Sequence, residues 1–126
     1  MEDDPFETGI AIREAMWGPE GARVKVEAAS DFQADFEERV TRHCFGETWS
    51  RPGLDRHTRS ILTIGMVIAQ GRAHELRVHV RGALGNGVTR DEIREVLLHA
   101  SVYCGIPAAV EAFRNAEEVL DELGVE

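Results

Sequence analysis

The segment Gly71-Arg-Ala-His-Glu-Leu-Arg-Val-His-Val-Arg-Gly-Ala-Leu-Gly-Asn-Gly87 has the pattern of an amphipathic α-helix. Its apolar residues recur at helical spacing and predict one buried face. These residues are Leu76, Val80, Ala83 and Leu84. Arg72, Glu75 and His79 follow one another along the edge of that face. Charged groups beside a core are costly to desolvate, so we take this triple as the first candidate for a functional site.

Five further segments have helical patterns, and no segment alternates long enough to indicate a strand. The expected helices are roughly Phe6–Trp17, the Ser30–Gln33 capping box to about Phe45, Arg56–Gln70, a helix ending near Asn86, the Thr89–Glu92 capping box to Tyr103, and Pro107 to Gly124. Gly46–Asp55 is expected to be a loop, and Arg56–Gln70 a central helix because it is apolar nearly all round. The fold is predicted to be all-α, in one domain over residues 1–126.

Two faces of these helices are expected to be apolar. Phe32, Phe36, Val40 and Cys44 mark one face of the second helix. Val110, Phe113, Leu120 and Leu123 are expected to be buried by the last helix.

Composition excludes several classes of function. The 126 residues carry a formal net charge of −9 and no basic tract, which argues against binding of nucleic acid. No signal peptide or apolar run long enough to span a membrane is visible, so we expect a cytoplasmic protein. An anionic substrate would need a locally positive site, for which Arg51, Arg56, Arg59 and Arg72 are the candidates.

The stretch Phe45–Asp55 is a second candidate site. It places Glu47, Trp49 and Arg51 at alternating positions before Pro52–Gly53, where a locally extended backbone would point all three the same way. Such a set could clamp and cover a planar carboxylate ligand. The alternative is a tryptophan that packs in the core and an arginine that caps a helix. For the triple, the alternative is an exposed Glu75–His79 pair with a solvated Arg72.

Metal and thiol chemistry have weaker signals. The histidines show no metal-ligand spacing, so no bound metal is expected. Cys44 and Cys104 lie far apart without a CxxC, which supports neither a disulfide framework nor a zinc site. Cys44 is interpreted as a small core residue, and Cys104 as a thiol close to a helix start, where its pKa can be lowered.

Three blocks of sequence closely resemble the carboxymuconolactone decarboxylase family, within the alkylhydroperoxidase D-like superfamily. The blocks are Phe45–Ser60, Glu75–Leu84 with Gly87–Leu98, and Tyr103–Ala109. The resemblance runs from about residue 32 to residue 122 and is less distinctive over residues 18–31. Relatives with peroxidase activity carry a CxxC four residues before a histidine. Here Arg72 and Glu75 replace the two cysteines and His79 matches the histidine, which argues against peroxide chemistry.

The resemblance implies a small helical subunit that assembles into a ring-like homo-oligomer, usually a hexamer. It also implies cofactor-free decarboxylation of 4-carboxymuconolactone to 3-oxoadipate enol-lactone, in the protocatechuate branch of the β-ketoadipate pathway. A related lactone as substrate, a thiol-dependent peroxidase that uses Cys104, and a non-catalytic helical oligomer that binds a small acid or a partner protein are the alternatives.

Residue roles follow from this chemistry as hypotheses. His79 is assigned as the proton donor, with its ring oriented by Glu75 or Glu47. Arg51 and Arg72 are assigned to carboxylates or to the developing oxyanion, and Trp49 to the wall that excludes water. Tyr103 and Cys104, from the third block, complete the set of expected substrate-binding residues.

Overall fold

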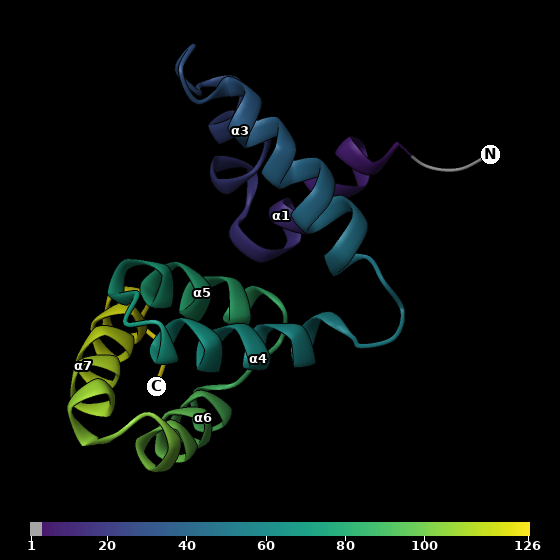
Figure 1. The fold of residues 1–126 in the computed structure, drawn as a ribbon. Helices are drawn as coiled ribbons and strands as arrows, with labels where there is room; N and C mark the ends of the chain where they lie inside the picture. The colour runs from purple at the N-terminus through teal and green to yellow at the C-terminus, as the bar shows by residue number, and fades with distance from the viewer. Residues whose placement is uncertain (1–3) are drawn as a thin grey trace. The chain divides into compact units, whose positions relative to one another are not determined.

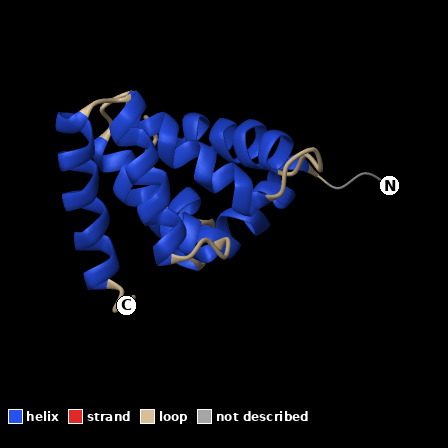
Figure 2. Cartoon of the chain, turned by 90° about the horizontal axis from the view of Figure 1, so that it is seen from below, coloured by secondary structure: helices blue, strands red, loops and turns tan. Residues whose placement is uncertain are grey.

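The computed structural model describes residues 4–126, and every regular element among them is helical (Figures 1 and 2). The prediction of an all-α fold is therefore confirmed. The chain divides into two compact units, one ending at Arg56 and the other comprising His57–Glu126. The assignment of residues 1–126 to one domain stays a prediction.

The N-terminal unit contains two long helical stretches and two short ones. Its elements are α1 (Pro5–Trp17), η1 (Pro19–Gly21), α2 (Arg23–Glu27), α3 (Ala34–Arg39) and η2 (Val40–Trp49). The short helices η1 and α2 lie between residue 18 and the Ser30 capping box, where the sequence patterns predicted no helix. Ser30 Oγ accepts a hydrogen bond from the Gln33 backbone, as one half of the expected capping box, but α3 begins only at Ala34.

Glycine allows α1 and η2 to pack with their backbones almost in contact. A Cβ atom placed on Gly9 would lie 2.0 Å from the carbonyl oxygen of Thr41, and one on Gly46 would lie 2.0 Å from that of Pro5. Any side chain at either position would force the two helices apart. This crossing is what sets the position of the second half of η2 against α1.

A buried arginine occupies the interior of the same unit. Arg13 is 4% exposed and donates hydrogen bonds to the carbonyl oxygen of Gly21 (3.0 Å), to Thr41 Oγ1 (3.0 Å) and to Glu37 Oε2 (3.1 Å). Its guanidinium carbon also lies 5.7 Å from the centre of the Phe45 ring. A buried charge is tolerated when its donors are satisfied in this way.

The helix that begins with α3 does not end at Phe45 as expected. It continues as a π-helix through Val40–Trp49, so residues 46–49 are helical and the expected loop shrinks to the stretch after Trp49. The hydroxyls of Thr48 and Ser50 donate to the carbonyl oxygens of His43 and Gly46, which satisfies acceptors at this helix end. π-Helical turns are rare and often occur at functional sites.

The C-terminal unit has four α-helices around an aliphatic core. They are α4 (Arg56–Ala69, whose first residue is the last of the N-terminal unit), α5 (Ala73–Gly85), α6 (Arg90–Tyr103) and α7 (Ile106–Glu122). The predicted stripe of α5 is confirmed, because Leu76, Val80 and Ala83 are buried and Leu84 packs against the core. Glycine at positive φ ends α4 at Gly71, and the Thr89 capping box is complete.

Two expected apolar faces are wrong for the single chain. α7 buries mainly a face of small residues, while Val110, Phe113 and Leu123 are exposed. The residues buried on α7 are Ala109, Ala112, Ala116, Val119 and Leu120. Because alanines let helices approach closely, the core selects that face and leaves the larger apolar groups outside.

The second and third predicted helices show the same behaviour. Phe32 is 95% exposed and Phe36 63% exposed, so residues 4–126 do not cover these two members of the expected apolar face, whereas Val40 packs against the aromatic cluster of the N-terminal unit. α4 was expected to be central, but Leu62 and Met66 on one of its sides are also exposed. The periodic pattern predicts that such apolar residues share one face of a helix, but it does not show whether another part of the chain covers that face.

Candidate functional site

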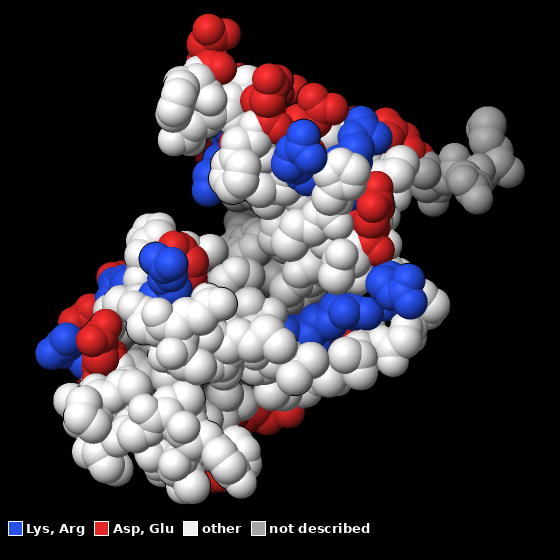
Figure 3. Space-filling model, in the orientation of Figure 1, with Lys and Arg blue, Asp and Glu red and all other residues white. Residues whose placement is uncertain are grey.

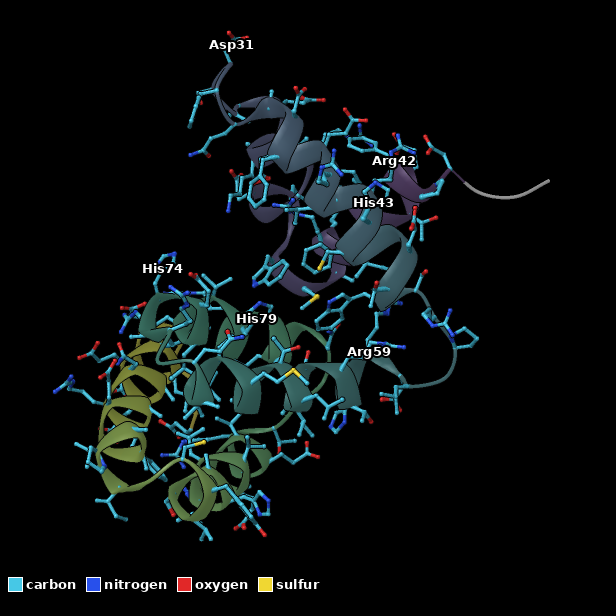
Figure 4. The ribbon with its side chains drawn as sticks, viewed as in Figure 1. Asp31, Arg42, His43, Arg59, His74 and His79 are labelled. Carbon is cyan, nitrogen blue, oxygen red and sulfur yellow. The ribbon has the colours of Figure 1, made fainter. Side chains whose placement is uncertain are left out.

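The α5 triple divides between the helix and the residue that precedes it. Arg72 is the N-cap residue, with non-helical φ and ψ of −96° and 79°, and it lines a small cavity of about 40 Å³. Glu75 is exposed, and His79 is partly buried one turn further along. Figure 4 shows His74 and His79 on the same helix. The structure therefore keeps Glu75 and His79 one turn apart on α5, and places Arg72 outside the helix.

The environment of His79 favours its neutral form. Burial lowers the pKa of His79 from its ordinary value of 6.5, and the negative charge of Glu75 partly offsets this by raising it. A protonated His79 is consequently a stronger acid than an exposed imidazolium. Glu75 also lies 3.8 Å from Nε2 of His74, a residue that is largely exposed.

The expectation of an extended Glu47–Trp49–Arg51 strip is wrong, because Glu47 and Trp49 lie in η2. Consecutive helical residues point in different directions, so the three side chains do not share one side by alternation. Glu47 is exposed and its Oε1 lies 3.1 Å from Nδ1 of His43, one turn earlier (His43 is labelled in Figure 4). Trp49 is 7% exposed and packs in the aromatic cluster of the unit.

Trp49 and Arg51 nevertheless line one cavity of the N-terminal unit. This cavity has a volume of about 800 Å³ and lies between α1 and the residues that follow η2. Its charged lining residues are Asp4, Glu7, Arg51, Asp55 and Arg56. The ring of Trp49 is held by Phe45, with ring centres 5.7 Å apart, and Phe45 in turn meets the edge of Trp17 at 5.5 Å. The cavity can therefore offer a fixed indole and guanidinium groups to one ligand.

Tyr103 and Cys104 line a different cavity, which lies within the C-terminal unit. It also has a volume of about 800 Å³ and runs between α4 and α6. Most of its lining is aliphatic, from Ile61, Leu62, Met66, Ala69, Val96 and Ala100. Tyr103 is 79% exposed, and its ring centre lies 5.0 Å from that of His99. His79 is not one of the described residues that line this cavity.

A polar pair at this second cavity had no signal in the sequence. His57 Nε2 lies 3.0 Å from the carboxylate of Glu92, although the two residues are 35 positions apart. The backbone of Thr89 donates to the same carboxylate, and these hydrogen bonds lower the pKa of Glu92. The sequence predicted the capping box of Thr89 and Glu92. It did not predict the contact of Glu92 with His57, because a periodic pattern does not show which helix starts lie close together.

The environment of Cys44 does not activate its thiol. Cys44 and Cys104 are both in the free form, and Cys44 is exposed rather than buried as expected. Desolvation raises the pKa of the Cys44 thiol, while a hydrogen bond with Trp49 and the charge of Arg13 lower it less. A raised pKa leaves less of the reactive thiolate. No group of three His, Cys, Asp or Glu side chains within residues 4–126 could hold a metal ion.

Comparison with known proteins gives a consistent answer. The chain is 43% identical to 4-carboxymuconolactone decarboxylase of Acinetobacter baylyi over 124 residues, which covers 98% of this chain and 92% of the relative. It is 42% identical to nitrosuccinic acid decarboxylase of Metarhizium robertsii over 118 residues, covering 94% of this chain and 82% of the relative. It is also 44% identical over 80 residues to an uncharacterised 15.0 kDa protein of Paracoccus denitrificans, covering 62% and 60% of the two chains.

The family profile covers both candidate regions completely. It matches residues 34–118, a span that includes η2, the turn that bears Arg51, the whole of α5 and the end of α6. Together with the identity to the Acinetobacter enzyme over nearly the whole chain, this match places the helical fold and its candidate residues in one family. The chain belongs to the carboxymuconolactone decarboxylase family.

Proposed function

We propose that the chain is a carboxy-lyase that decarboxylates 4-carboxymuconolactone to 3-oxoadipate enol-lactone. The observation that carries this proposal is the likeness to a decarboxylase of that name over 98% of the chain. The proposal includes the protocatechuate branch of the β-ketoadipate pathway as the setting, and a reaction that needs no cofactor or metal.

The chemistry of the substrate explains why no cofactor is needed. The departing carboxylate is attached to a saturated ring carbon next to the ring double bond, and this double bond is conjugated with the lactone carbonyl. When the bond to CO2 breaks, its electron pair enters the ring as a dienolate with charge on the lactone oxygen. One proton added to the carbon beside that carbonyl then gives the enol-lactone. The protein has to bind the anion, stabilise the dienolate and deliver this proton.

We assign the proton to His79, in its protonated form. The lowered pKa of His79 makes that form a strong donor, and the neighbouring Glu75 supports protonation of the ring. Arg51 is assigned to a substrate carboxylate and Trp49 to the cavity wall, since both line the N-terminal cavity. Glu47, Arg72, Tyr103 and Cys104 remain proposed members of the site, with Arg72 as a second group for the developing oxyanion.

Exposed apolar residues support self-association. Eight apolar or aromatic residues of α4, α6 and α7 are exposed in the single chain: Leu62, Met66, Leu98, Val102, Tyr103, Ile106, Val110 and Phe113. Figure 3 shows few charged groups over α6 on the visible face. An exposed set of this size is typical of a protein interface. We propose a homo-oligomer, with a hexameric ring as the specific expectation.

We also propose a cytoplasmic location, in keeping with a substrate that is a small metabolite. No helix within residues 4–126 is both long and apolar enough to cross a membrane.

The fungal relative supports a second substrate. Nitrosuccinic acid, like the lactone, carries a carboxyl group whose electron pair can pass to a neighbouring acceptor, here a nitro group. The identity to that relative is 42%, close to the 43% of the lactone decarboxylase. Decarboxylation of nitrosuccinate is therefore the second candidate function.

One experiment separates these functions. Purified protein is mixed with fresh 4-carboxymuconolactone or with nitrosuccinate, and CO2 release and ultraviolet absorbance are followed. We expect catalysed CO2 release from the lactone, with kcat/KM at least about tenfold above that for nitrosuccinate. Faster turnover of nitrosuccinate would reverse the order of the two candidates, and no acceleration with either compound would refute the proposed function.

The thiol-dependent alternative has its own test. A Cys104→Ser variant that keeps full decarboxylase activity, in a protein that does not consume peroxide, would exclude it.

A further inference from the structure

Two arginines of α5 bind side chains of α7. Arg77 donates to Oε2 of Glu118 (2.5 Å) and to Oε1 of Glu122 (3.1 Å), and Arg81 donates to the other oxygen of Glu122. Arg77 also donates to Oδ1 of Asn115, at 3.3 Å. We call these five residues the α5–α7 clasp. None of them is assigned a role in the proposed reaction.

The clasp differs from an isolated surface ion pair, which contributes little because water and salt screen it. The side chain of Arg77 is only 24% exposed, and its two terminal nitrogens bind carboxylates from two successive turns of α7. Glu122 in turn binds both arginines. Asn115 donates to the backbone carbonyl of Glu111 (2.8 Å), which holds its own side-chain oxygen toward Arg77. Such a network restricts the geometry of the two helices more than single pairs do.

The two carboxylates of the clasp do not stabilise α7 itself. Glu122 is the last residue of α7 and Glu118 lies one turn before it, and within Ile106–Glu122 the last turn has no basic residue. Negative charge near the C-terminal end of a helix is unfavourable, because the helix dipole already makes that end negative. The favourable interactions of both carboxylates are therefore those with the arginines of α5.

The apolar contact between α5 and α7 does not by itself fix their relative position. Leu76, Val80 and Ala83 of α5 share the aliphatic core with residues of α7, among which Ala112 and Ala116 are small. Burial of apolar surface is non-directional, and alanines present only low ridges to a neighbouring helix. Small shifts of α5 along α7 therefore change apolar burial little. The hydrogen bonds of the clasp depend on distance and angle, so they oppose such shifts.

His79 lies on the side of α5 that faces away from the clasp. It follows Arg77 by two residues, which is a rotation of roughly 200° about the helix axis. Because a short helix moves as a rigid element, a shift at Arg77 moves His79 (labelled in Figure 4) by a similar distance. Misplacement of a reacting group by about 1 Å can slow a reaction about 10²-fold.

We propose that Arg77 and Glu122 are positioning residues, which hold α5 on α7 so that His79 is placed to deliver its proton. This inference rests on the proposed function in taking His79 as the proton donor. Neither positioning residue contacts the substrate in this proposal. Since Arg51 of the N-terminal cavity is assigned to the substrate carboxylate, loss of the clasp should lower kcat and leave KM nearly unchanged.

Two substitutions break the clasp with opposite changes in charge. Arg77→Gln removes a positive charge, and Glu122→Gln removes a negative one. If the clasp positions His79, both variants should lower kcat for 4-carboxymuconolactone about tenfold, with KM within about twofold of the original value. If charge alone acted on the reaction, the two variants would change kcat in opposite directions. Arg77→Lys, which keeps the charge without the two-pronged geometry, should recover part of the loss.

The matched control is Arg94→Gln. Arg94 is exposed and forms an ion pair with Asp91 at 3.0 Å, and both residues lie in α6. The control therefore removes the same charge as Arg77→Gln, but from an ion pair within one helix, and it should leave kcat unchanged. Circular dichroism checks that each variant is folded at the assay temperature. If Arg77→Gln does not fold, Arg77→Lys and Arg81→Gln, which remove fewer contacts, replace it in the same measurements.

A proton NMR titration reports on His79 without turnover. Its imidazole signal is identified by comparison with His79→Gln. In the original protein burial lowers the pKa of His79, and Glu75, whose charge opposes this effect, is present in every clasp variant. A displaced α5 changes the burial of the ring, so we expect the pKa of His79 to move toward 6.5 by about 0.3 pH units or more in both Arg77→Gln and Glu122→Gln.

The outcomes separate the clasp from the reaction. Lower kcat with unchanged KM, and a raised pKa of His79, in both clasp variants would support the inference. Unchanged kcat and pKa in both folded variants would overturn it, and so would opposite changes in the two, which indicate an effect of charge alone. If the original protein does not decarboxylate the lactone, the proposed function fails, while the NMR titration still decides whether the clasp positions His79.

Discussion

The two units of the chain bury different kinds of side chain. The C-terminal unit has a large aliphatic core with fourteen buried residues, among them Ile64, Ile93 and Leu97. The apolar cluster of the N-terminal unit has four buried members, Ile12, Met16, Phe45 and Trp49, beside the buried Arg13. The stability of the N-terminal unit thus depends in part on the hydrogen-bonded charge of Arg13, whereas that of the C-terminal unit depends mainly on burial of apolar surface.

The cavities differ in the same way. The N-terminal cavity has charged groups at its lining, whereas the cavity between α4 and α6 is mainly aliphatic. A unit built around polar contacts can hold guanidinium groups and an indole in place for an anion. An aliphatic groove is better suited to bury another apolar surface. The cavity of the N-terminal unit is therefore the more polar of the two, and that of the C-terminal unit the more apolar.

The largest expected effect would break the polar interior of the N-terminal unit. Arg13→Ala should lower the free energy of unfolding by about 3–5 kcal/mol, because it leaves Glu37 and Thr41 without their buried partner. Urea unfolding followed by tryptophan fluorescence measures this, since both tryptophans lie in that unit. Arg39→Ala, at an exposed position, is the control and should change stability by less than about 0.5 kcal/mol. A similarly small loss for Arg13→Ala would contradict the comparison.

The second effect asks whether the C-terminal unit contributes chemistry as well as packing. His79→Ala should lower kcat for 4-carboxymuconolactone about 10²-fold, because no other group is assigned to protonate the dienolate. The control is His74→Ala on the same helix, at a side chain that is 83% exposed. Retained activity in a folded His79→Ala protein would remove the proton donor from the proposal.

A smaller effect compares the two capping boxes. Thr89→Ala should cost about 1 kcal/mol of stability, because it removes the side chain that accepts from Glu92 in a complete box. Ser30→Ala should cost less, since Ser30 Oγ receives a longer bond (3.3 Å) outside any helix. Thermal unfolding of the two variants measures the difference. The reverse order would mean that the N-terminal unit depends on its connection before α3 more than its geometry suggests.

The smallest effect is a pH dependence of stability. The folded chain holds the pKa of His79 below 6.5, so as pH falls past 6.5 the unfolded chain binds a proton that the folded chain still resists. Stability is therefore complete above that pH and declines as pH falls toward the lowered pKa. Thermal unfolding between pH 7.5 and pH 5 should show a shallower decline for His79→Gln than for the original protein. If stability declined equally steeply with falling pH in both proteins, burial would not lower the pKa of His79.

Much of the C-terminal unit could be predicted because its signals are local. The stripe of α5, the glycine break at Gly71 and the capping box at Thr89 each depend on residues within a few positions of one another. The predicted boundary between the second helix and the following loop was wrong, because the helix continues there as a π-helix. Nothing in the stretch Val40–Trp49 announces a π-helix, so the alternation of Glu47, Trp49 and Arg51 was interpreted as an extended strip.

The apolar faces failed for another reason. Periodicity identifies Phe32, Phe36, Val110 and Phe113 as apolar but does not distinguish a surface covered by the same chain from one that is left open. For the Phe45–Asp55 candidate site, the sequence predicted some of the residues that share a cavity but not how their side chains are arranged. Trp49 and Arg51 do share a cavity, as the clamp hypothesis required, but Glu47 pairs with His43 instead. Such pairings depend on helix type and crossing, which single-sequence patterns do not encode.

The π-helical stretch Val40–Trp49 makes this protein unusually sensitive to the length of one segment. Deleting a single residue there would let the helix rewind to the α form and would turn every later residue of the stretch by roughly 100° about the axis. The indole of Trp49 would then swing away from Phe45 while the composition of the chain hardly changed. In this part of the chain, deletion of a single residue would displace more side chains than most substitutions do.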